Sequence, residues 1–89
     1  MVLQQGGVKL TRVELRLFGE LRCYVKGLKL GEGYLLDVEG NCTIDDLMRN
    51  LEIPSEIVKI ILVNGRSCDV CYKLKDNDRL ALFPPIAGG

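Results

Sequence analysis

The chain has 89 residues, a length typical of one domain with a small hydrophobic core. Its 12 Lys and Arg residues balance 12 Asp and Glu residues, so bulk charge does not favour nucleic acid or an anionic membrane as a partner. Histidine is absent, which removes the commonest general base and the commonest metal ligand. A hydrophobic fraction of 47% indicates a globular domain, and the absence of histidine argues against an enzyme that acts alone.

Residues 1–10 are expected to be a flexible leader that precedes a folded domain over residues 11–83. The leader has no basic region followed by a long apolar one, as secretory signals have. No apolar run approaches the roughly 20 residues of a transmembrane helix. These features predict a cytoplasmic protein that does not contact a membrane.

The first element expected in chain order is a half-buried strand over residues 12–18. Val13, Leu15 and Leu17 share one face because side chains alternate along a strand, and Gly19 ends the pattern. The opposite face carries Arg12, Glu14, Arg16 and Phe18. Residues 19–33 mix short helical spacings with three further glycines, which predicts a loop with one short helix.

A second strand is expected at residues 34–39, followed by a turn and then a helix. Thr43 reads as the helix N-cap, with Asp45 and Asp46 in the first turn. The apolar residues that follow have the spacing of an amphipathic helix: Ile44, Leu47, Met48 and Leu51. Pro54 ends or restarts the helical region, and residues 55–58 form one further turn.

The apolar run at residues 60–63 predicts a short buried strand, and the Asn-Gly pair at 64–65 predicts a hairpin turn. Residues 70–72 are a weak strand candidate, and residues 76–78 predict a turn. Residues 79–83 are the last strand, with Leu80 and Leu82 on one face. This order predicts an α+β domain of the β-grasp (ubiquitin-like) class, a small mixed sheet of four to five strands with one main helix on one face. The first and last strands lie side by side in its centre and run parallel.

Residues 84–89 are expected to form an extended tail that projects from this domain. Pro84 and Pro85 have no backbone N–H, so a central strand must stop before them. Gly88 and Gly89 have no Cβ and can enter a channel too narrow for other residues. A terminal carboxylate, with a reference pKa of about 3.5, is ionised at neutral pH. The tail is therefore suited to be a substrate of another enzyme; the alternative is an ordinary frayed terminus.

The four cysteines include one C-x-x-C, formed by Cys68 and Cys71. A strong zinc signal would need a second such pair or histidines, and Cys23 and Cys42 stand apart in the sequence. A redox C-x-x-C usually opens a helix, whereas this one lies in strand-like sequence. We therefore predict no metal site and keep a metal- or redox-responsive module as an alternative.

Five stretches together resemble the ubiquitin-like sulfur carriers, a family that includes the small subunit of molybdopterin synthase and the thiamine sulfur carrier. The resemblance covers roughly residues 13–89, and its marks are residues 13–19, 43–47, 62–65, 74–80 and 83–89. The Pro-Pro pair before Ile86-Ala87-Gly88-Gly89 is more similar to the molybdopterin branch. The C-x-x-C, the leader and the long segment 19–33 depart from the family pattern.

The resemblance implies that the chain has no catalytic side chain and binds no cofactor. A nucleotide-dependent, E1-like enzyme would use ATP to adenylate the carboxylate of Gly89. A persulfide enzyme would supply sulfur, leaving a thiocarboxylate that is donated within the large catalytic subunit of molybdopterin synthase. Gly88 would keep the tail narrow, while Ala87, Ile86, Pro85 and Pro84 would set its reach and position. A thiamine-type carrier, or a ubiquitin-like modifier conjugated through Gly89, is the alternative.

The body must be held by its partner while the tail is inserted. Phe83 is expected to lie beside Phe18 on the neighbouring strand, where an exposed aromatic pair would be a contact patch. Filling a corner of the core is the alternative for either ring. Arg16 and Arg79, with Arg66, are candidates for charged contacts, and solvated surface is the alternative for each.

Overall fold

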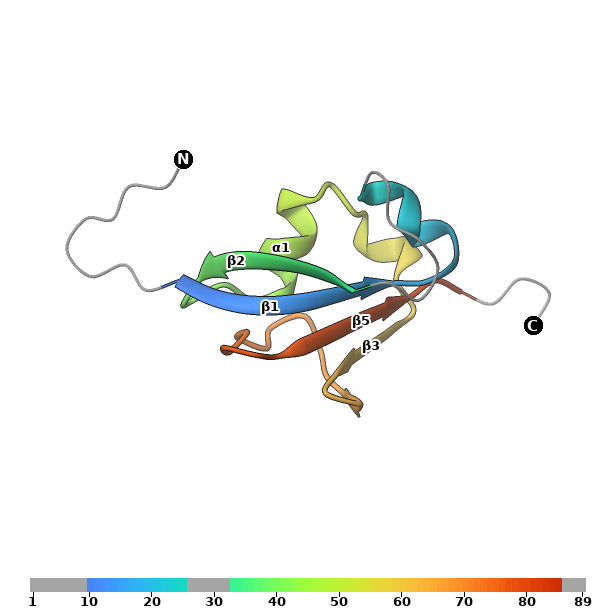
Figure 1. Cartoon of the computed structure of the whole chain (residues 1–89). Helices are drawn as coiled ribbons and strands as arrows, with labels where there is room; N and C mark the ends of the chain where they lie inside the picture. The colour runs from blue at the N-terminus through green and yellow to red at the C-terminus, as the bar shows by residue number, and fades with distance from the viewer. Residues whose placement is uncertain (1–9, 26–32, 86–89) are drawn as a thin grey trace.

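A computed structural model describes residues 10–25 and 33–85 of the chain. The rest of the predicted leader (1–9) and of the predicted tail (86–89), together with residues 26–32, lies outside that range. Five strands form one mixed sheet: β1 (Leu10–Leu17), β2 (Tyr34–Glu39), β3 (Ile60–Val63), β4 (Arg66–Ser67) and β5 (Arg79–Phe83). The helices α1 (Ile44–Asn50), η1 (Gly19–Tyr24) and η2 (Ser55–Ile57) lie on one side of the sheet (Figure 1).

The sheet order is β2-β1-β5-β3-β4, which places the first and last strands together in its centre. β1 and β5 run parallel, with Leu15 opposite Leu80 and Leu17 opposite Leu82. β2 pairs with β1 and β3 pairs with β5, both antiparallel. This arrangement confirms the predicted β-grasp architecture.

The core lies between the inner face of the sheet and the helices. In β1 the odd-numbered residues from Thr11 to Leu17 are buried and the even-numbered ones are at least partly exposed, as the alternation predicts. The same rule buries Leu80 and Leu82 of β5. The most buried side chains that complete this core are Leu21, Ile44, Leu47, Met48, Ile53 and Leu74.

Helix α1 begins with a reciprocal capping box. The Thr43 hydroxyl accepts the Asp46 N–H at 3.1 Å, and the Asp46 carboxylate accepts the Thr43 N–H at 3.2 Å. These two bonds satisfy donors that a helix N-terminus otherwise leaves unpaired. The predicted N-cap is confirmed. The helix ends at Asn50, and Pro54 precedes the next helical turn, η2.

The weak strand candidate at residues 70–72 is wrong. The Tyr72 N–H donates to the Asp69 carbonyl at 3.2 Å, which closes a turn here, and the second strand of the hairpin is β4 instead. The carbonyls of Val70 and Tyr72 accept the N–H groups of Asp45 and Ile44, each at 3.0 Å. These acceptors serve the first turn of α1, so the tertiary contact with the helix outweighs a three-residue strand pattern.

Strand β3 has the predicted bounds, but it is less buried than predicted. Ile60 is 41% exposed, and Ile61 and Leu62 are only half-buried. β3 lies one strand from the edge of the sheet, and its outer neighbour β4 has just two residues. The turn between them has positive φ at Asn64 (53°) and Gly65 (84°), as expected of an Asn-Gly hairpin.

Candidate functional site

The last two residues of β5 are hydrogen-bonded, one to each side, immediately before the tail begins. The Phe18 N–H donates to the Leu82 carbonyl at 3.1 Å, and the Lys59 N–H donates to the Phe83 carbonyl at 2.8 Å. Pro84 then ends the ladder because it has no N–H. Since β1 and β5 are parallel, the tail departs beside the end of β1, far from the point where Leu10 enters the sheet (Figure 1).

Gly19 lies directly against the first proline of the tail. Its φ of +60° is a left-handed conformation that other residues adopt at a cost. A Cβ at this position would lie 2.7 Å from Cγ of Pro84. Glycine at 19 therefore lets the start of η1 approach the tail closely. Sequence reasoning identified Gly19 only as the end of a strand.

The rings of Phe18 and Phe83 stack at the site of tail departure. Their centroids are 4.4 Å apart and their planes differ by 8°. Both side chains are half-buried, on the opposite side of their strands from the buried Leu17 and Leu82. The two rings are adjacent, as predicted, and neither fills the core; their role as a partner contact stays a prediction.

Three further apolar residues extend this aromatic pair across the outer face of the sheet. Ile60 is the register partner of Phe83, and Leu62 is the partner of Ala81, so all four point to the same face. Together these residues form what we term the outer apolar patch: Phe18, Ile60, Leu62, Ala81 and Phe83. Sequence reasoning missed the contribution of β3, because the side to which Ile60 points depends on its register with β5.

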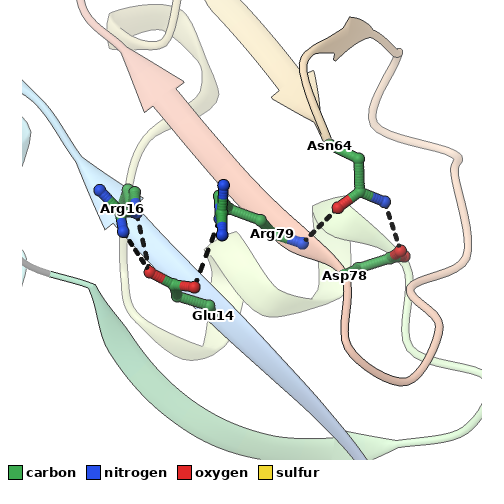
Figure 2. Close-up of polar contacts among 5 residues, drawn as sticks. All are labelled: Glu14, Arg16, Asn64, Asp78 and Arg79. Carbon is green, nitrogen blue, oxygen red and sulfur yellow. Dashed lines mark hydrogen bonds and ion pairs between the residues drawn. The ribbon is translucent and has the colours of Figure 1, made fainter.

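A charged cluster borders this patch on β1 and β5, and Figure 2 shows its three side chains. Glu14 Oε2 accepts from Nε of Arg16 at 2.8 Å, and Glu14 Oε1 lies 3.4 Å from Nε of Arg79. The hydrogen bond from Arg16 is the main reason why the pKa of the Glu14 carboxyl is lower than usual, and Arg79 adds to it. Two predicted arginines are thus brought together by an acid that sequence reasoning did not select.

The start of β5 is secured by the buried carboxylate of Asp78. It accepts hydrogen bonds from the Asn64 amide (2.9 Å), the Tyr72 hydroxyl (2.9 Å) and the Lys75 N–H (2.8 Å). The Asn64 side chain in turn accepts the Arg79 N–H at 3.0 Å (Figure 2). Burial, followed by the bond to Asp78, raises the pKa of Tyr72. This network joins the Asn-Gly hairpin to the turn before β5.

The remaining predicted site residues are not part of this surface. Arg66 is exposed on β4, at the far edge of the sheet from β2. Ile86, Ala87, Gly88 and Gly89 lie outside the described residues. Within residues 10–25 and 33–85, no three Cys, Asp or Glu side chains are placed to hold a metal ion. No helix in the same ranges has the length and hydropathy of a membrane span.

Several solved structures are similar to this chain. The Haloferax volcanii HVO 2177 protein is 26% identical, with a TM-score of 0.74 over 98% of this chain and 94% of that one. SAMP1 from Haloferax volcanii is 25% identical, with a TM-score of 0.63 over 88% and 99% of the two chains. A complex of subunits 1 and 2 of the molybdopterin-converting factor from Helicobacter pylori matches at 24% identity, with a TM-score of 0.57 over 89% and 100%.

No curated protein matches the sequence. The model of the ThiS family matches residues 15–89, which include β1 from Leu15 onward, every later element and the C-terminal diglycine. The chain therefore belongs to the ThiS family and has the β-grasp fold of the ubiquitin-like sulfur carriers.

Proposed function

We propose that this protein carries sulfur as a thiocarboxylate on Gly89, and that it donates this sulfur as the small subunit of molybdopterin synthase. The observation that supports the proposal best is the departure of the tail. A strand held by hydrogen bonds on both sides ends at Phe83, beside the partly exposed outer apolar patch, and a proline pair leads toward the diglycine. A partner that holds the patch would receive the tail in a defined direction.

The chemistry needs only the main-chain carboxylate. An oxygen of the Gly89 carboxylate attacks the α-phosphate of ATP in the activating enzyme, and pyrophosphate leaves. A persulfide sulfur then attacks the acyl carbon and expels AMP, forming an acyl disulfide. A thiol cleaves that S–S bond, which releases the thiocarboxylate and leaves a disulfide on the sulfur donor. The carrier's own side chains serve to bind the partner and to position the tail.

The molybdopterin role is favoured by the Pro84-Pro85 pair and by the similarity to subunit 1 of molybdopterin-converting factors. In that role, the partners are an E1-like adenylating enzyme, a persulfide enzyme and the large catalytic subunit. Co-purification tests this assignment. Recovery of a synthase catalytic subunit supports it, whereas recovery of only a thiamine-pathway partner would assign the chain to the thiamine type of carrier.

Mass spectrometry tests sulfur loading directly. The chain is incubated with its activating enzyme, ATP and a persulfide donor, and the intact mass is measured. The expected result is the gain in mass produced when one sulfur replaces one oxygen. A chain without Gly88 and Gly89 should show no such gain. The mass of the full chain would stay unchanged if the proposal is wrong. The activating enzyme must then be shown to be active on a second, different carrier protein.

Substitutions in the outer apolar patch test how the carrier docks. Phe83→Ala should weaken binding to the activating enzyme by about tenfold or more, as expected for an aromatic side chain in the centre of an interface. Leu35→Ala is the matched control, because Leu35 is 62% exposed on the same face of the sheet but lies on β2, beyond the charged cluster. Titration calorimetry measures both affinities. Equal losses of affinity in Phe83→Ala and Leu35→Ala would show that the outer apolar patch is not part of the interface.

Conjugation to lysine is the second candidate function, favoured by the similarity to SAMP1, a small archaeal modifier protein. It uses the same adenylated Gly89, with an amine instead of a sulfur as the attacking group. Peptide mapping after activation separates the two functions. Isopeptide bonds from Gly89 to partner lysines support a modifier, and a thiocarboxylate without such bonds supports a dedicated carrier.

A further inference from the structure

A cleft of about 750 Å³ lies between β2 and α1, on a part of the fold that the proposed sulfur chemistry does not use. Its apolar lining includes Leu36 and Val38 of β2, Leu10 of β1, and Leu47 and Leu51 at the inner side and the end of the helix. Cys42 adds a buried thiol. This volume is in the range of sites that accept several side chains or a small ligand, roughly 300–1,000 Å³.

The border of the cleft is acidic. Asp37, Glu39 and Asp46 line it, and Arg49 is the one basic residue among the described lining residues. Arg49 is engaged in an i,i+4 ion pair with Asp45 at 3.0 Å.

Two of these acids have no ion pair with the described residues, although the Asp46 carboxylate also accepts the Thr43 N–H in the capping box. Asp37 is paired with Arg12 at 3.0 Å, whereas Glu39 and Asp46 form no ion pair with the described residues. Burial raises the pKa of the Cys42 thiol, and the charges of Asp46 and Glu39 raise it further. Their negative potential therefore extends into the cleft.

The strand beside the cleft can also offer hydrogen bonds to a partner's main chain. β2 is at the edge of the sheet, and in the described part of the chain it pairs only with β1. Its other side presents main-chain N–H and C=O groups, and edge strands with this feature accept an added strand. An extended peptide can use both the edge and the cleft, which a compact small molecule cannot do.

We propose that the cleft between β2 and α1 is a docking site for an extended peptide whose apolar side chains are flanked by lysine or arginine. The main chain of this peptide pairs with β2, and its alternate apolar side chains enter the cleft. Its cations lie against Glu39 and Asp46. Such a site would let the protein bind a second partner while the outer apolar patch and the tail are engaged.

Backbone amide NMR of the full chain tests this site with a capped peptide that alternates valine and lysine. The expected result is saturable shifts at β2 and α1, with affinity at least tenfold higher than for a valine–glutamate peptide of the same length. The Glu39→Gln, Asp46→Asn double variant should weaken binding about tenfold, the loss expected from two surface charges. Its control is Glu20→Gln, Glu56→Gln, an equal charge change at exposed residues away from the cleft.

Several outcomes would overturn the proposal. They are the absence of shifts at β2 and α1, shifts gathered instead at the outer apolar patch, and equal affinity for the two peptides. Shifts that depend on protein concentration without peptide would assign the cleft to a second copy of the chain. If deletion of residues 1–9 alone reproduces the shifts, the chain's own leader occupies the cleft.

Discussion

Asp78 should stabilise the fold strongly, because its carboxylate accepts three hydrogen bonds. Asp78→Ala leaves the Asn64 amide, the Tyr72 hydroxyl and the Lys75 N–H without their acceptor, so we expect a loss of about 3 kcal/mol in the free energy of unfolding. Tyr72→Phe removes one of these bonds and should cost about 1 kcal/mol. Urea unfolding measures both variants. Equal losses would show that Asp78 does not organise the network.

Glu14 makes a second residue-scale prediction, which concerns pH. Its folded-state pKa is lowered by Arg16 and Arg79, so the stabilisation is fully present above the unfolded value of about 4.3. It is lost as pH falls through the folded pKa, because a protonated Glu14 no longer pairs. Glu14→Gln should therefore cost about 0.5–1 kcal/mol at neutral pH and nothing in strong acid.

Urea titrations across the acidic range, with wild type and variant side by side, measure this difference. Glu20→Gln is the control, since Glu20 is exposed and forms no ion pair with the described residues. A Glu14→Gln penalty that stays constant as pH falls would mean that the charge of the carboxylate does not stabilise the cluster.

At the scale of elements, we expect the first residue of η1, Gly19, to control how the tail leaves β5. Gly19 and Gly65 both have positive φ, but a Cβ at Gly65 meets nothing within 4 Å whereas one at Gly19 meets Pro84. We expect Gly65→Ala to cost about 1 kcal/mol from backbone strain alone. Gly19→Ala should cost about 1–2 kcal/mol more and should shift the NMR resonances of Pro84. Equal costs with an unmoved Pro84 would contradict this role.

For the whole molecule, we predict that the fold does not depend on the C-terminal residues that would carry sulfur. A chain that ends at Pro85 should keep its free energy of unfolding within about 0.5 kcal/mol, because the sheet is complete at Phe83. The same chain should acquire no thiocarboxylate. A chain that ends at Asp78 should not fold, since β5 lies between β1 and β3 and supplies Leu80 and Leu82 to the core. Circular dichroism and intact mass distinguish these outcomes.

Much of this architecture could be predicted from local patterns. Three features each involve only residues close in sequence, so the residue types there predict the local structure: the alternation in β1, the N-cap at Thr43 and the Asn64-Gly65 turn. Residues 70–72 show the limit of such patterns. Their carbonyls serve the helix N-terminus, a contact that a three-residue window cannot contain.

The sequence by itself determined the class of the fold and the strand that ends at Phe83, because these depend on periodicity and on residue type. The tail chemistry proposed for Gly89 rests instead on the resemblance of the tail to the sulfur carriers. The tertiary structure decided which further side chains join these surfaces. Ile60 joins Phe83, Arg79 joins Glu14, and Gly19 meets Pro84, over separations that only strand order and register define. A shift of one residue in register would turn each of these strand side chains to the other face of the sheet.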